Sequence, residues 1–186
     1  MKQIKVIFLD IDGVINAAHT YTKNWKSQKD WLEFSKKHQA EAEKLGIRMA
    51  FHMPIQYSIG WLNQLIEETG AKVVISSTWR GHGAEYMQKV LDFEGVKCEV
   101  IGETIYNHKQ IYEDRIPLYS WHYDRDVMRG EQIKLWLEQH PEVEKYVILD
   151  DDADMLLEQE FNFIHVDNEY GFTRKDYLMA LAILKL

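Results

Sequence analysis

The chain has 186 residues, enough for one domain with a substantial core, and its 46% content of hydrophobic residues excludes a disordered protein. Its formal net charge of -8 argues against a wide face for duplex nucleic acid, although a local pocket for a strand end stays compatible with it. The single cysteine, Cys98, excludes an internal disulfide, and no segment has the pattern of a signal peptide or a membrane span. We therefore expect a cytoplasmic protein.

Apolar segments alternate with amphipathic helical patterns along the chain. Strands are predicted at 4–9, 71–75, 97–101, 145–149 and 161–166. Helical patterns between them end near Gly70, Gly95 and Pro141, and a last helix begins at Thr173. This alternation predicts an α/β fold with a central parallel sheet and helices on both of its faces.

Two segments interrupt this alternation. Residues 16–56 are polar and aromatic, and a helix is predicted over 27–45. Residues 103–127 mix tyrosines and a tryptophan with basic side chains, which either stack nucleobases or, more simply, pack onto the core. We expect a single domain over 1–186, with a small cap insertion at 16–56 and a second insertion or substrate loop at 103–127.

Acidic residues follow two of the predicted strands. Asp10 and Asp12 come directly after strand 4–9, and Asp150 and Asp151 come after strand 145–149. Strand carboxyl ends are where open α/β sheets bind ligands, and clustered carboxylates repel one another unless a cation lies between them. If the two strands are neighbours, these acids form a site for a hard cation such as Mg²⁺. The regular ligand spacing of a calcium-binding loop is absent.

Hydroxyl and basic side chains complete the candidate site. Ser76 and Ser77 follow strand 71–75, and Arg129 begins a predicted helix that also carries Lys134. Each has a simpler explanation alone, since hydroxyls often cap helices and helical cations are usually solvated. Arg80 either binds a substrate phosphate or pairs with an acid for structural reasons.

In this order the motifs resemble those of the haloacid dehalogenase (HAD) superfamily of phosphotransferases. The segment 8–14, with Asp10 and Asp12, resembles its first motif; Ser76 or Ser77 resembles the second, and Asp150-Asp151 the fourth. The segments 75–80 and 129–137 are similar to those of small HAD domains associated with Swiss Army Knife RNA-repair proteins, distant relatives of polynucleotide phosphatase domains. The resemblance covers about two-thirds of the chain, and neither 16–53 nor most of 103–127.

The resemblance implies a Rossmann-like HAD fold and Mg²⁺-dependent hydrolysis of a phosphomonoester through an aspartyl-phosphate. Asp10 would be the nucleophile and a metal ligand. Asp12 would be the general acid and base, with its backbone carbonyl on Mg²⁺. Asp151 would be the further metal ligand and Asp150 its orienting neighbour, or the reverse.

The remaining roles follow from the same resemblance. Ser76, or alternatively Ser77, would hydrogen-bond a phosphoryl oxygen. Arg129 would offset the charge of the phosphoryl group, at a position where the superfamily more often has lysine. Lys134 is the alternative to Arg129, and Arg80 is a further candidate for substrate binding.

The resemblance favours a nucleic-acid end or a nucleotide as the phosphorylated substrate. A small phosphorylated metabolite is the alternative within the same enzyme class. A non-catalytic HAD scaffold that binds a partner is the alternative from another class. The intact set of acids argues against a scaffold, because degenerate members tend to lose those residues.

Overall fold

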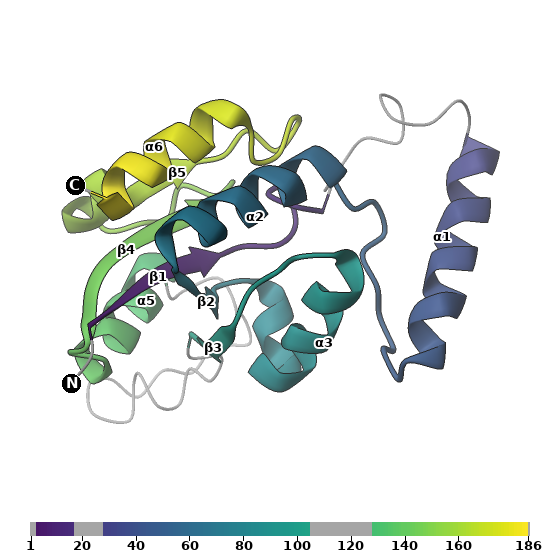
Figure 1. Cartoon of the computed structure of the whole chain (residues 1–186), viewed down its shortest axis with the longest axis horizontal. Coiled ribbons are helices and arrows are strands. Elements are labelled where there is room, and N and C mark those ends of the chain that lie inside the picture. Colours follow the sequence, from purple (N-terminus) through teal and green to yellow (C-terminus); the bar gives the residue numbers. More distant parts are fainter. Residues whose placement is uncertain (1–2, 17–27, 105–127, 186) are drawn as a thin grey trace, which may run out of the picture.

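A five-stranded parallel sheet lies at the centre of the molecule, in the order β3-β2-β1-β4-β5 (Figure 1). A computed structural model describes residues 3–16, 28–104 and 128–185 of the chain. The strands are β1 (Ile4–Leu9), β2 (Lys72–Ile75), β3 (Val100–Glu103), β4 (Val143–Asp150) and β5 (Phe163–His165). The predicted α/β fold with a central parallel sheet is confirmed.

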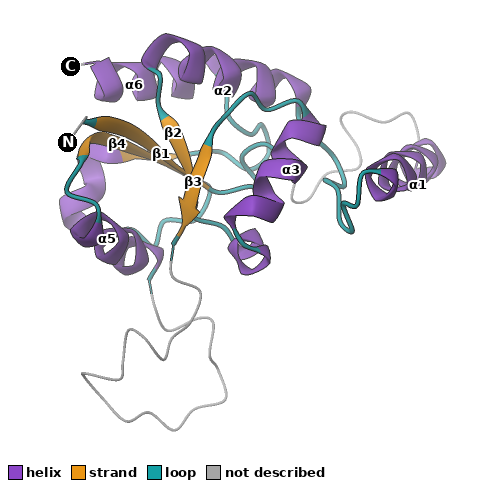
Figure 2. Ribbon diagram, turned by 60° about the horizontal axis from the view of Figure 1, so that its bottom comes forward, coloured by secondary structure: helices purple, strands orange, loops and turns teal. Residues whose placement is uncertain are grey.

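Helices cover both faces of this sheet. The helices in the described part of the chain are α1 (Gln28–Lys44), α2 (Gln56–Thr69), α3 (Ala84–Glu94), α5 (Arg129–Gln139) and α6 (Arg174–Lys185), of which α1 does not cover the sheet. Figure 2 shows α2 and α6 on one side of the strands and α5 on the other. Among the described residues, none of the helices has the length and apolar character needed to cross a membrane.

The alternation of side chains along β1 explains the two layers of helices. Ile7 and Leu9 pack with buried residues of α2, α3 and α6. Val6 and Phe8 point to the opposite face and pack with Ile133 and Trp136 of α5. Because all of these strand side chains are fully buried, β1 is an apolar run rather than an alternating one, as expected for a strand covered on both faces.

Two glycines end helices where the sequence predicts. Gly70 follows α2 with φ 65°, and its N–H donates to the carbonyl of Ile66. Gly95 follows α3 with φ 87°. Left-handed backbone costs glycine little, which is why it terminates helices so often.

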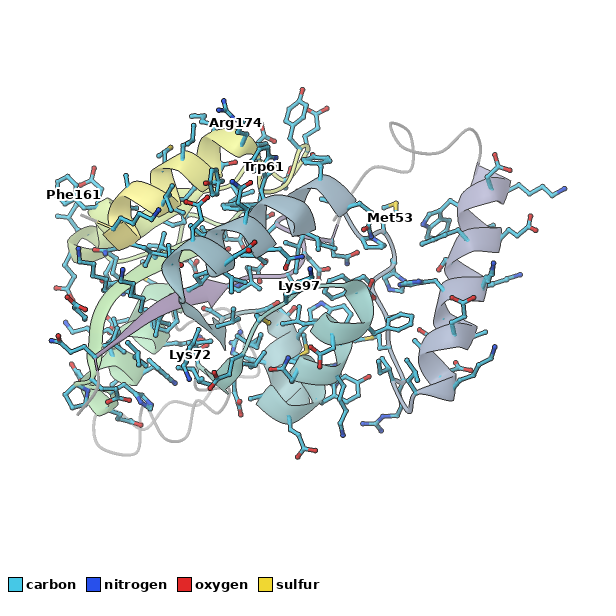
Figure 3. All side chains as sticks on the ribbon, in the orientation of Figure 1. Met53, Trp61, Lys72, Lys97, Phe161 and Arg174 are labelled. Atoms are coloured by element: carbon cyan, nitrogen blue, oxygen red, sulfur yellow. The ribbon has the colours of Figure 1, made fainter. Side chains whose placement is uncertain are left out.

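The third and fifth strands differ from their predicted bounds. Strand β3 begins at Val100 instead of residue 97, and the N–H of Lys97 donates to the side chain of Asn63, 2.7 Å away, rather than to a strand. The segment before β5 forms a 3-10 helix (Leu157–Asn162) that includes Phe161. Phe161 is 86% exposed and lies at the periphery of the molecule (Figure 3). The prediction that the strand begins at residue 161 was therefore wrong, because it relied on the apolar side chain alone.

Helix α1 forms within the predicted range 27–45 and stands apart from the sheet (Figure 1). Its contacts with the body include the fully buried Ala42, which belongs to the main core cluster, and His38, whose Nε2 lies 3.0 Å from each carboxylate oxygen of Glu94 on α3. Glu94 also accepts the N–H of Phe51 at 2.8 Å. The cap role of 16–56 stays a prediction, and most of 103–127 lies outside the described residues.

Candidate active site

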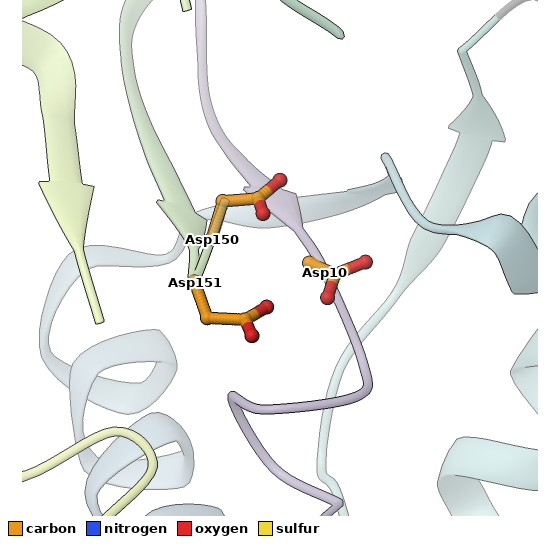
Figure 4. Close-up of side chains that lie close together, drawn as sticks. All are labelled: Asp10, Asp150 and Asp151. Atoms are coloured by element: carbon orange, nitrogen blue, oxygen red, sulfur yellow. The ribbon is translucent and has the colours of Figure 1, made fainter. Parts of the chain in front are cut away.

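Three carboxylates meet at the carboxyl edge of the sheet. Asp10 follows β1, Asp150 ends β4, and Asp151 follows it. The two strands pair directly, and the N–H of Asp10 donates to the carbonyl of Leu149 at 3.0 Å. One oxygen from each carboxylate lies within 4.8 Å of the others. Figure 4 shows the three side chains close together at this edge of the sheet. The structure thus brings together acids that the sequence places on separate strands.

Gly13 allows this close approach. Its φ is +80°, and a Cβ atom there would lie 2.4 Å from Cγ of Asp151. Any larger residue would therefore collide with a member of the acidic cluster. This contact gives the glycine of the Asp-x-Asp-Gly motif a steric reason as well as a conformational one.

Arg129 supplies the positive charge of the cluster. Its Nη1 lies 2.7 Å from Oδ1 of Asp10 and 3.0 Å from Oδ2 of Asp150, and it also donates to the carbonyl of Ser76. The side chain of Asp154 accepts the N–H of Arg129 at 2.9 Å and so anchors the start of α5. Lys134 instead forms an exposed ion pair with Glu158, 3.0 Å away. Of the two candidate cations, the structure places Arg129 at the acids.

Burial dominates the electrostatics of the acids. It raises the pKa of Asp10 to about 6, although the Arg129 charge and a hydrogen bond from Ser77 oppose the shift. Burial and the nearby Asp10 charge raise the pKa of Asp150 to about 9. Burial also raises the pKa of Asp151. Without a further cation, the cluster resists carrying its full negative charge.

The two serines after β2 differ in their hydrogen bonds. Both are fully buried. The hydroxyl of Ser77 accepts the N–H of Trp79 at 3.4 Å and so caps the 3-10 helix Thr78–His82. Within the described part of the chain, the hydroxyl of Ser76 has no hydrogen-bond partner. Arg80 is buried, and its Nη1 donates to the carbonyl of Ser77 at 2.7 Å, which favours its structural interpretation.

Asp12 has different neighbours from Asp10. Its Oδ1 accepts a hydrogen bond from Nδ2 of Asn16 at 2.6 Å, and its Oδ2 accepts one from Nε1 of Trp79 at 2.9 Å. Sequence reasoning missed both partners. Trp79 stands in the quoted second motif, but the sequence does not show whether its indole only packs in the core or also donates its N–H to a carboxylate.

The family comparison agrees with this arrangement. A family model described as the HAD domain in Swiss Army Knife RNA repair proteins matches residues 6–177, which include every acid of the site. The chain belongs to this HAD family. No curated protein and no solved structure matches the chain in the corresponding searches. Membership makes this HAD domain a hydrolase of the HAD family, and it confirms the resemblance seen in the motifs.

The acids of this HAD domain fit a hard divalent cation. HAD domains are generally metal-dependent, and carboxylate oxygens that lie this close together suit such an ion. A bound cation would relieve the repulsion and desolvation that raise the pKa of Asp10 and Asp150. The side chain of Asp12 is directed to Asn16 and Trp79 instead and is not one of the three clustered carboxylates.

Proposed function

We propose that this HAD domain is a Mg²⁺-dependent phosphomonoesterase that works through an aspartyl-phosphate on Asp10. The observation that carries the proposal is the buried meeting of Asp10, Asp150 and Asp151 with Arg129, beside a second acid, Asp12, that is held separately. A nucleophile, a proton-transfer group and a fixed cation are the parts that phosphoryl transfer needs.

The chemistry balances over two steps. In the first, Asp10 attacks phosphorus, the ester P–O bond breaks, and Asp12 gives its proton to the leaving oxygen. In the second, Asp12 takes a proton from water as that water attacks phosphorus. The bond from Asp10 then breaks and inorganic phosphate leaves. Mg²⁺, held by Asp10, Asp151 and the Asp12 carbonyl, would supply charge that offsets the negative phosphoryl group.

Three assignments within the proposal have specific support. Asp150 engages both oxygens with protein groups, because Oδ1 accepts the N–H of Asp152 at 3.0 Å and Oδ2 forms an ion pair, although no hydrogen bond, with Arg129. Among the described residues Asp151 forms no ion pair of this kind, which makes it the better direct ligand. Ser76 is the better phosphoryl donor, since its buried hydroxyl has no partner in the described residues whereas that of Ser77 is engaged.

We further propose that the substrate is a nucleotide or a nucleic-acid end and that residues 16–56 form a cap over it. The family description, which refers to RNA repair, supports this substrate class. The cap is supported by the return of its chain to the site, where Asn16 pairs with Pro54 in a β-bridge. The net charge of -8 favours a short end held locally over a long duplex.

The decisive experiment compares Asp10→Asn with Asp152→Asn. Asp152 is an acid of the loop that follows β4 at the same edge of the sheet, and its side chain is 72% exposed, so it serves as the matched control. With nitrophenyl phosphate and Mg²⁺, we expect Asp10→Asn to lose all measurable turnover and Asp152→Asn to keep most of it. Full activity in Asp10→Asn would overturn the assignment of the nucleophile. The absence of wild-type turnover on any phosphate ester would favour a binding scaffold.

A substrate panel then separates the two enzyme classes. Oligonucleotides with a 3′- or a 5′-phosphate are compared with nucleotides and with small phosphorylated metabolites at equal concentrations. A kcat/KM that is highest for an oligonucleotide or a nucleotide supports the proposed substrate. A clear preference for a sugar phosphate or another metabolite contradicts it.

A further inference from the structure

The carboxyl group of Asp12 is held on both of its oxygens. Asn16 donates to Oδ1 at 2.6 Å and Trp79 donates to Oδ2 at 2.9 Å. Both donors are themselves buried, with 2% of Asn16 and 5% of Trp79 exposed. A carboxyl group held at both oxygens by buried partners cannot rotate freely about its Cβ–Cγ bond.

The segment that returns from α1 fixes both donors in turn. The N–H of Met53 donates to Oδ1 of Asn16 at 2.9 Å, which orients the amide so that its nitrogen faces Asp12. The ring of Phe51 packs edge-on against Trp79, with 5.4 Å between ring centroids. Met53 lies on the stretch that joins α1 to the body (Figure 3). The geometry of Asp12 therefore depends on residues from three separate parts of the chain.

The donors of Asp12 also differ in charge from the partner of Asp10. Asp10 faces the guanidinium of Arg129 at 2.7 Å, and a full positive charge favours an ionised nucleophile. Asp12 faces an amide and an indole, which are neutral donors. Neutral donors fix the orientation of a carboxyl group by hydrogen bonds alone, without pairing it with a positive charge.

We propose that Trp79 and Asn16 are positioning residues that hold Asp12 in the plane where it transfers its proton. The inference rests on the proposed phosphatase function and adds two residues to it. It assigns Trp79 a role other than packing, and it links the segment 51–53 to the rate of the chemical step.

The test exploits the need of poor leaving groups for a proton. A nitrophenolate leaves without protonation, whereas the alkoxide of a nucleoside 5′-monophosphate requires the general acid. Trp79→Phe keeps an aromatic ring but removes the N–H. We expect it to lower kcat on the nucleotide by about 10- to 100-fold, with KM unchanged, because a displaced catalytic group loses rate steeply. On nitrophenyl phosphate, we expect the transfer of phosphate to Asp10, measured as a burst, to slow by less than about threefold.

Two further variants separate positioning from packing. Trp136→Phe is the matched control, because Trp136 is also 5% exposed but packs against Phe8 on the face of α5. We expect this variant to keep the wild-type rates on both substrates. In an Asp12→Asn background, Trp79→Phe should cause little additional loss on the nucleotide, because the residue acts through Asp12.

The outcomes are distinct. Equal losses on both substrates, or unchanged kcat on the nucleotide in a folded Trp79→Phe protein, would overturn the positioning role. A full additional loss in the Asp12→Asn background would also overturn it. If the wild-type protein turned over neither substrate, the proposed function would be wrong, and the positioning role of Trp79 and Asn16, which rests on it, would be wrong as well.

Discussion

Removing the charge of Arg129 should destabilise the protein far more than removing that of Lys134 on the same helix. Arg129 lies 2.7 Å from Asp10 and 3.0 Å from Asp150, and its side chain is 11% exposed. At an effective dielectric constant of about 20, the contact with Asp10, whose pKa of about 6 leaves it ionised at the assay pH, gives a gross attraction of about 6 kcal/mol. Desolvation cancels much of this attraction, and breaking a buried pair from one side costs about 3–5 kcal/mol.

The comparison uses Arg129→Met and Lys134→Met. Lys134 and its partner Glu158 are 43% and 60% exposed, so solvent screens that pair and its loss should change stability little. The free energy of unfolding is measured by urea titration at pH 8 with EDTA, followed by tryptophan fluorescence. We expect a difference between the two variants of at least about 2 kcal/mol.

A change of pH provides an internal check on the cause. Burial raises the pKa of Asp10 to about 6 and that of Asp150 to about 9, so both carboxyls take up protons more readily than in the unfolded chain. At pH 5 a larger share of them is neutral, and the loss in Arg129→Met should shrink. Similar costs for the two variants, or a loss that grows toward acidic pH, would refute the electrostatic account of the cluster.

Three other predictions concern residues around the site and the base of α1. Gly13→Ala should weaken Mg²⁺ binding and destabilise the fold by about 1–3 kcal/mol, as measured by calorimetry and urea titration, because its Cβ would collide with Asp151. Asp151→Asn should abolish the increase in melting temperature that Mg²⁺ causes, whereas Asp152→Asn should keep it; equal effects would contradict the ligand assignment. Burial raises the pKa of Glu94, so its contribution to stability is greatest below pH 4.5 and is lost as pH rises through its folded pKa. The unfolding free energy of Glu94→Gln relative to wild type should therefore increase from pH 4.5 to pH 7.5. A difference between the two proteins that does not change with pH would contradict the raised pKa of Glu94.

The strand ends that carry the acids were predictable from local patterns. An apolar run that stops at Asp10 and another that stops at Asp150 each mark a strand and its carboxyl edge. Their convergence needed only that the two strands be neighbours, which the pairing of Leu9 with Leu149 confirms. The left-handed glycines after α2 and α3 were equally visible, because helix termination there is a local property.

The partners of Asp12 were not predictable in this way. Trp79 lies 67 positions from Asp12 along the chain, and nothing in an indole signals that its N–H meets a carboxylate. Asn16 is near in sequence, but its orientation depends on the N–H of Met53, 37 positions further on. The predicted start of β3 was wrong for a similar reason, because the backbone N–H of Lys97 donates to the side chain of Asn63 instead of to a neighbouring strand. Such contacts depend on tertiary structure, which local periodicity does not encode.

The central place of β1 has a consequence for the order in which the protein can form during synthesis. One edge of Ile4–Leu9 can pair with β2 early, but its other edge has no partner until Val143–Asp150 emerges from the ribosome. Until then a largely apolar strand keeps an open edge, which is a template for association with other nascent chains. During this interval Asp10 also lacks its neighbours Asp150 and Arg129. The cluster of acids that would bind a cation therefore forms only when β4 pairs with β1, which is also when the open edge of β1 is covered.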